Sequence, residues 1–263
     1  MPFSSEKSLL NIPLRGSGII DRLKHLSPQN FGSLAGSLIP WFAAAAAISC
    51  MAGLYLALFV APTDAQLGEV YRVIFIHVPT AWMSMSIYLV MAFWAGVRLA
   101  LDTRLSATMT QALAPTGAMF TFLALWTGSL WGKPAWGVWW IWDARLASEL
   151  ALLFLYLGFL ALKLVVHDPR RAAQAGAVLA LIGVIDISII YFSVQWWSTL
   201  HQDASISLKS GPAMAGTVFA GMIVTAVGFG MYSVAVTLWR ARCIILERER
   251  DAEWVAEYVR TLR

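Results

Sequence analysis

Six long apolar stretches dominate this sequence, at residues 38–60, 76–100, 109–130, 146–165, 176–192 and 214–238. A helix needs about 20 residues to cross a hydrocarbon core about 30 Å thick, and the stretches have lengths of this order. Only 13% of the 263 residues are charged, which is too few for a soluble domain. None of the stretches has the alternating pattern of a membrane β-barrel. The sequence predicts an all-α integral membrane protein, with one six-helix bundle over residues 1–263.

The basic residues predict how the bundle is oriented. Fifteen of the 19 lysines and arginines lie in the N-terminal tail, the second and fourth connections, and the C-terminal tail. The other four are Arg72, Lys133, Arg145 and Lys209. The positive-inside rule therefore places both termini in the cytoplasm, with residues 239–263 as a cytoplasmic tail. We expect this tail to continue the last span as a solvated helix, or else to rest an apolar stripe on the membrane or a partner.

Other sequence features mainly exclude functions. The first 37 residues lack the pattern of a removable signal peptide, so the first span is expected to be an uncleaved anchor. The two cysteines form no Cys-x-x-Cys, which argues against thiol–disulfide exchange. The net charge of +4 follows from the topology, and we expect no nucleic-acid partner.

The segment 131–146 reads WGKPAWGVWWIWDARL and holds five tryptophans, which are Trp131, Trp136, Trp139, Trp140 and Trp142. It falls between the third and fourth spans, outside the membrane. An aromatic belt at the interface explains one or two rings per helix end, not five. The spacing of Trp136, Trp139 and Trp140 predicts a short surface helix with one face covered by indoles. Such a face would suit a flat aromatic ligand.

Two of the four histidines, His77 and His201, also fall at the outer face. On a helix Trp197 and His201 would share one side. Either histidine alone is typical of an interfacial residue bonded to a headgroup or a carbonyl. As a pair with the tryptophans they suit the two axial positions of a haem better than a zinc site, which needs three or four ligands.

Outer cations would complement the propionates of a haem. Arg72, Lys133 and Arg145 are the candidates, and the alternative for Arg145 is a salt bridge with Asp143 or Glu149. Within the membrane, Asp186 is a functional candidate because a mid-span carboxylate is costly. We find no second intramembrane acid or base to accompany Asp186, so a packing or partner role is expected for it.

The tryptophan segment, together with FIHVPTAWMSM, ASELALLFLYLG and SVQWWSTLHQ, resembles the "WWD" superfamily of haem-handling proteins in cytochrome c maturation. A six-span chain of this length is most similar to its CcmC family, haem exporter protein C of the multi-component System I pathway. The resemblance covers nearly the whole chain. The larger haem-lyase relatives have many more spans and additional histidines, which this chain lacks.

The resemblance implies a function and a set of site residues. His77 and His201 would be the axial ligands of haem b at the periplasmic face of a bacterial inner membrane. The cofactor-binding platform would comprise Trp131, Trp136, Trp139, Trp140, Trp142, Asp143 and Arg145, with Arg72 and Trp197 as further candidates. No independent catalytic residue is identified.

The resemblance also implies partners. Such proteins present haem to the chaperone CcmE, which becomes covalently attached to it, and associate with CcmD, the ABC-type CcmA–CcmB pair and membrane lipid. The alternative is a transmembrane haem transporter subunit, which needs a polar path that the spans, apart from Asp186, do not offer. A dihaem cytochrome b would need histidine pairs inside the spans, and the sequence has none there.

Overall fold

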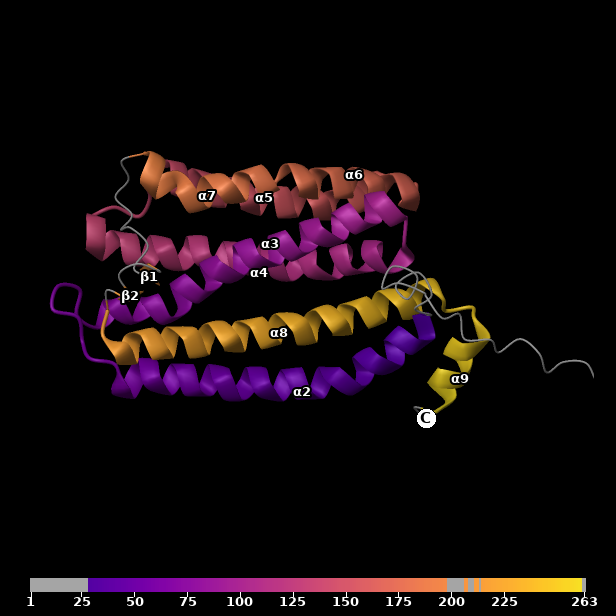
Figure 1. Cartoon of the computed structure of the whole chain (residues 1–263), viewed down its shortest axis with the longest axis horizontal. Coiled ribbons are helices and arrows are strands. Elements are labelled where there is room, and N and C mark those ends of the chain that lie inside the picture. The colour runs from indigo at the N-terminus through magenta and orange to yellow at the C-terminus, as the bar shows by residue number, and fades with distance from the viewer. Residues whose placement is uncertain (1–27, 198–205, 208–210, 213, 262–263) are drawn as a thin grey trace, which may run out of the picture.

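The computed structural model describes residues 28–197, 206–207, 211–212 and 214–261, and over these ranges it is a bundle of helices (Figure 1). Six helical segments are long and apolar enough to cross a membrane. The first is α2 (Pro28–Tyr55), which runs on into the π-helical turn η1 (Leu56–Val60). The others are η2 with α3 (Glu69–Val73, Ile74–Leu101), α4 (Arg104–Trp136), α5 (Ala144–Val165), α6 with α7 (Pro169–Ile182, Val184–Trp196) and α8 (Gly216–Arg248). The predicted six-span fold class is confirmed.

Two smaller elements complete the described chain. The antiparallel pair β1 (Ile206–Ser207) and β2 (Gly211–Pro212) lies between α7 and α8. A short helix, α9 (Glu253–Thr261), follows α8. The last span does continue as a helix past the apolar stretch that ends at residue 238. This helix, α8, ends at Arg248, and α9 is a separate helix that follows after a turn.

The prediction of a short surface helix after the third span is wrong. Instead, α4 continues to Trp136, and Gly137 ends it in the left-handed conformation with φ 80°. A side chain with a β-carbon rarely adopts this angle, so glycine is the favoured residue at this helix end. Residues 137–143 are not helical, and α5 begins at Ala144. Trp136 therefore lies on a helix, while Trp139 and Trp140 lie on irregular backbone.

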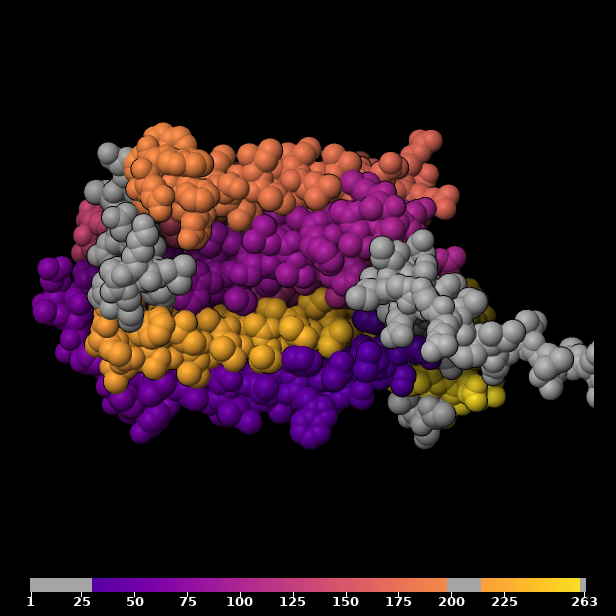
Figure 2. Space-filling view, in the orientation of Figure 1, coloured from indigo at the N-terminus to yellow at the C-terminus, as the bar shows by residue number. Residues whose placement is uncertain are grey.

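The spans are arranged in layers along one long axis. Helix α2 packs along α8, α8 packs on α3 and α4, and α5 to α7 lie on the other side of α3 and α4. The bands of α2, α8 and α3 lie side by side in the space-filling view (Figure 2). The larger apolar core lies among α3 to α7, around the fully buried Tyr88, Phe120 and Tyr156.

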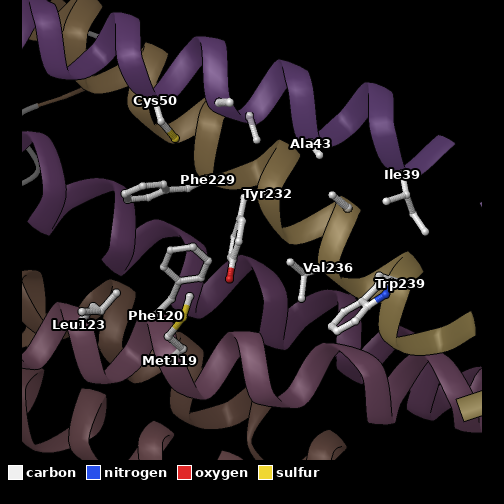
Figure 3. A pocket seen from close by; sticks show the side chains of 13 residues that line it. Ile39, Ala43, Cys50, Met119, Phe120, Leu123, Phe229, Tyr232, Val236 and Trp239 are labelled. Carbon is white, nitrogen blue, oxygen red and sulfur yellow. The ribbon is translucent and has the colours of Figure 1, made fainter. Parts of the chain in front are cut away.

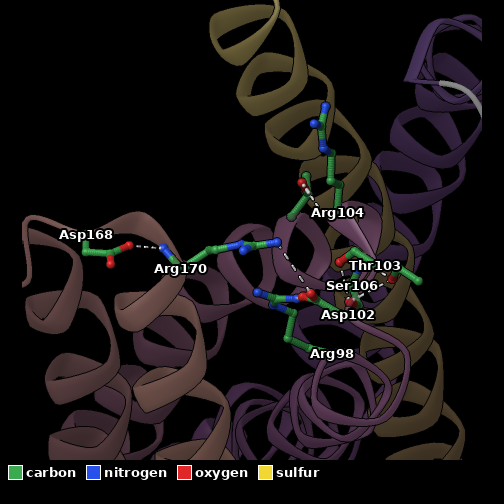
Figure 4. A network of polar contacts seen from close by, with 8 residues as sticks. Arg98, Asp102, Thr103, Arg104, Ser106, Asp168 and Arg170 are labelled. Atoms are coloured by element: carbon green, nitrogen blue, oxygen red, sulfur yellow. Dashed lines mark hydrogen bonds and ion pairs between the residues drawn. The ribbon is translucent and has the colours of Figure 1, made fainter.

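The turn between α3 and α4 is fixed by an ionic and hydrogen-bonded network (Figure 4). Asp102 caps α3 in the left-handed conformation and pairs with Arg98 on α3. It also lies 3.8 Å from the Arg170 guanidinium at the start of α6. Thr103 caps α4 by accepting from the Ser106 amide at 3.3 Å. We call this end, with the end of α8 at Arg248, the basic end, and the opposite end, with residues 131–146, the tryptophan end.

The packing of α4 against α5 generates a stability prediction. A β-carbon added at Gly117 would stand 2.1 Å from the ring of the buried Tyr156. Gly117→Ala should therefore lower the free energy of unfolding by roughly 1–3 kcal/mol. Thermal unfolding in detergent, followed by circular dichroism, measures this. The control is Gly230→Ala in α8, where a β-carbon meets nothing within 4 Å and alanine favours the helix. Equal melting temperatures for the two variants would contradict the prediction that the Gly117–Tyr156 contact leaves no room for a β-carbon.

Candidate functional site

A small cavity at the tryptophan end brings several of the predicted site residues together. Its walls come from α3, α4, the irregular segment and α5, and its volume is about 40 Å³. The lining residues are His77, Ala81, Ala124, Leu125, Gly128, Trp136, Trp140, Arg145, Leu146 and Glu149. Cavities that enclose a whole organic ligand usually measure 300–1,000 Å³. A ligand as large as a porphyrin would therefore contact these residues at the surface and not be enclosed by them.

His77 stands in the first turns of α3 and is held by α4. Its Nδ1 lies 3.1 Å from the Ala124 carbonyl oxygen and 3.2 Å from the Thr127 hydroxyl. The Thr127 hydroxyl donates its proton to the Leu123 carbonyl at 2.6 Å, so both contacts of Nδ1 are to acceptors. Donation from Nδ1–H fixes the tautomer and leaves the lone pair on Nε2, which is the arrangement found in metal-binding histidines.

The neighbours of His77 fix the plane of its ring. Trp131, in the last turns of α4, meets the imidazole edge to face with ring centroids 5.6 Å apart. Tyr71 packs on the same indole at 5.9 Å. Gly128, also on α4, is so close that a β-carbon there would stand 3.0 Å from the His77 ring. The ring is therefore held between two helices in one orientation.

The five tryptophans divide into two sets by exposure. Trp131, Trp136 and Trp140 are partly buried, and we call them the inner tryptophans. Trp139 and Trp142 are 56% and 78% exposed, and we call them the outer tryptophans. Trp142 meets Trp140 edge to face at 5.4 Å, so the two sets are in contact. The segment thus has one face toward the cavity and another toward the surroundings.

Among the polar groups of the cavity, which also include Glu149, two donors suit a carboxylate group of a ligand. The Trp140 indole N–H is shielded from solvent and has no acceptor among the described residues. Arg145 lines the same cavity, and its guanidinium donates to the Ile190 carbonyl of α7 at 3.5 Å. An indole N–H and a guanidinium are both donors to carboxylate oxygens.

Asp143 organises the backbone at this site. It is the N-cap of α5, and its carboxylate accepts from the Leu146 amide at 2.7 Å. This contact fixes the position at which the irregular segment ends and α5 begins. It therefore also fixes the position of Arg145 in the first turn of α5. Asp143 and Glu149 both lie near enough for their charges to interact with that of Arg145. The two alternatives for Arg145, local ion pairing and ligand binding, are therefore compatible.

The remaining predicted cations have partners away from the cavity. Arg72 binds Glu69 and the carbonyls of Ala57 and Ala61, so it caps the end of η1. Lys133 donates to the Gly137 carbonyl at 2.9 Å and lies 6.0 Å from the centre of the Trp139 ring. Among the predicted cations on the described part of the chain, only Arg145 lines the cavity with His77.

The second predicted histidine, His201, lies outside the described residues. Helix α7 ends at Trp196, and Trp197 has an extended backbone with φ −130°. The helix expected to carry Trp197 and His201 on one face therefore ends before Trp197. Trp196 stacks on Phe192 at 5.2 Å and meets Trp197 at 5.9 Å, so aromatic rings line the end of α7.

A buried carboxyl group beside His77 was not predicted. Glu149 of α5 is 8% exposed and lies 2.7 Å from the Ser84 hydroxyl of α3. The expectation that no other intramembrane acid accompanies Asp186 is wrong, because Glu149 is within a span and near enough to interact with the Asp186 charge. The sequence signal was the four-residue spacing of Arg145 and Glu149 on one helix face. Asp186 itself stands in the first turn of α7, where the helix dipole favours a negative charge.

Comparison with known proteins finds one family over most of the chain. The model of the family described as heme exporter protein C matches residues 22–256. The heme exporter protein C of Escherichia coli K12 is 43% identical over 233 residues, covering 88% of this chain and 94% of that protein. The same-named protein of Bradyrhizobium diazoefficiens is 45% identical over 222 residues, or 84% of each chain. That of Haemophilus influenzae is 40% identical over 239 residues, covering 91% and 97%.

The role of Asp143 as a cap generates a prediction that separates its geometry from its charge. Asp143→Ala removes the acceptor and should lower the free energy of unfolding by about 1 kcal/mol. Asparagine caps a helix nearly as well, so Asp143→Asn should melt close to the unsubstituted protein. Thermal unfolding in detergent compares the three. If Asp143→Asn were as unstable as Asp143→Ala, the contribution of Asp143 would come from its charge and not from the cap.

Proposed function

The chain belongs to the heme exporter protein C family, and we propose from this that it binds haem b at the tryptophan end and presents it to a haem chaperone. The six candidate spans make it a multi-pass membrane protein. In our proposal the membrane is the bacterial inner membrane, and the tryptophan end faces the periplasm. The process served is the maturation of c-type cytochromes.

The hydrogen bonding of His77 is the observation that carries this proposal. Its Nδ1 contacts the Ala124 carbonyl at 3.1 Å, which supports Nε2 as the nitrogen that would bind iron. A second bond to Thr127 and the edge of Trp131 fix the ring in place. A histidine with only a structural role would not need to open onto a cavity that also holds an arginine and two indoles. We propose His201 as the second axial ligand.

The rest of the cavity fits the other parts of a haem. Trp136 and Trp140, the inner tryptophans that line the cavity, offer flat apolar faces to a porphyrin plane. Arg145 and the Trp140 N–H supply donors for a propionate, and the charge of Glu149 lies near enough to interact with that of Arg145. Bound haem would supply the iron and the reactive vinyl edge, while the protein supplies position and orientation. Because the cavity is small, much of the porphyrin would remain accessible.

The outer tryptophans suit the transfer to a partner. Trp139 and Trp142 expose large rings and do not line the cavity, and such rings commonly anchor protein interfaces. We propose that they contact the chaperone CcmE while the inner tryptophans contact haem. CcmD and the CcmA–CcmB pair complete the proposed complex.

Ligation by the two histidines predicts a spectroscopic change. His77→Ala and His201→Ala should each abolish or shift the Soret absorbance of haem bound to the purified protein. His167 is the matched control, because it is exposed in the connection between α5 and α6 at the opposite end. His167→Ala should leave the spectrum unchanged. A bis-histidine spectrum that persists in both His77→Ala and His201→Ala would overturn the assignment of the ligands.

The two sets of tryptophans predict two separable defects. Replacing Trp139 and Trp142 together with alanine should reduce the covalent chaperone–haem adduct and leave the haem spectrum intact. Replacing Trp136 and Trp140 together should reduce haem binding itself. Haem-stained gels measure the adduct, and absorbance measures the binding. Trp41→Ala, at an exposed site on α2, controls for general loss of indoles. The division is wrong if both pairs give the same defect.

A further inference from the structure

A second cavity, larger than the one at His77, lies in a groove over α8 between α2 and α4 (Figure 3). Its volume is about 550 Å³. The walls are mainly apolar and include Phe120, Phe229 and several alanines. The polar side-chain groups of the lining are the Tyr232 hydroxyl, the Cys50 thiol and the Trp239 N–H. None of the lining residues is acidic or basic. The groove lies within segments that are long and apolar enough to span a membrane, so it faces hydrocarbon.

The groove has the length of one leaflet of a bilayer. Along α2 it runs from Cys50, near the middle of the apolar stretch 38–60, to Ile39. Eleven residues of helix correspond to about 16 Å, which is roughly half of a hydrocarbon core 30 Å thick. An acyl chain of the leaflet at the basic end would therefore lie along it from end to end.

Two guanidinium groups flank the mouth of the groove at the basic end. Arg240 of α8 donates to the Thr116 hydroxyl at 2.6 Å, and Thr116 is one turn beyond Met119, a lining residue of α4. Arg242 lies on the α2 side, where its Nη1 is 2.9 Å from the position of a β-carbon at Gly36, and its guanidinium also donates to the Tyr258 hydroxyl of α9. Gly36 is one turn beyond Ile39 on α2.

The mouth also has the aromatic residue typical of a membrane interface. Trp239 lines the groove next to Arg240, and it is 56% exposed (Figure 3). Indole rings favour the headgroup level, where the ring is in an apolar layer and the N–H reaches polar groups. The mouth is therefore at the depth where lipid phosphates lie.

We propose that this groove binds one anionic phospholipid, with an acyl chain between α2 and α4 and its phosphate between Arg240 and Arg242. The acyl chain supplies little selectivity, since the lipid tails around it are as apolar as the groove. The selectivity comes from the charge-assisted bonds of two arginines to a phosphate in an anionic headgroup. A zwitterionic lipid of the same chain length would fit the groove but bind less tightly.

Native mass spectrometry of the full chain in detergent tests this proposal. Phosphatidylglycerol and phosphatidylethanolamine with identical acyl chains are added in equal amounts. The protein should retain one phosphatidylglycerol with a preference on the order of tenfold, and Arg240→Gln with Arg242→Gln should remove that preference. Arg170→Gln is the control, since its side chain is 85% exposed and away from the groove. Circular dichroism confirms that each variant is folded.

A second pair of variants tests the groove itself. Ala43→Phe fills it and should lower the retention of both lipids several-fold, whereas Ala44→Phe, its exposed neighbour outside the lining, should not. Equal retention by these two variants would overturn the groove as the binding site. Equal retention of the two lipids by the unsubstituted protein would overturn the role of the arginines. Displacement of the lipid by inorganic phosphate alone, or a co-purifying helix in its place, would also count against the proposal.

Discussion

Hydrocarbon offers no hydrogen-bonding partner to a peptide N–H or C=O, and this constraint shapes the whole protein. Each span satisfies its backbone internally as a helix. Several hydroxyl side chains inside the spans follow the same rule, because they donate to carbonyls one turn earlier. Thr121 bonds to Gly117, Thr225 to Gly221 and Ser233 to Phe229, at 2.7–2.9 Å. Such residues add polarity to the sequence without opening a polar path through the bundle.

The same constraint confines irregular backbone to the ends of the bundle, and the candidate site is built there. Gly137 ends α4 and Asp143 starts α5, so the segment between them is held at both sides. Its tryptophans can then face in two directions, which a single helical face would not allow. His77 reaches the same place from α3, since its Nδ1 bonds to α4. Three helix ends thus fix a histidine, an arginine and two indoles around one cavity.

The opposite end of the bundle has a different chemistry. Arginines and lysines gather there, and several stand in the last turns of helices, where the dipole favours them. The network around Asp102 fixes the turn between α3 and α4, while Arg240 and Arg242 stand beside the apolar groove. The two ends are therefore specialised in our proposals, one for presenting haem and the other for holding a lipid.

Apolar length and low charge alone determined the six helical spans, because burial in hydrocarbon permits few alternatives. The sequence also predicted that His77, Arg145 and the tryptophans lie in one region, and the structure brings them together at one end of the bundle. It could not determine where α4 ends, since a left-handed Gly137 outweighs the helical spacing of Trp136, Trp139 and Trp140. Nor could it reveal that Glu149 meets Ser84, or that Ala124 orients His77, because these contacts join residues 47 to 65 positions apart. Only the packing of α3 against α4 and α5 decides them, since side chains from different spans meet where the helices cross.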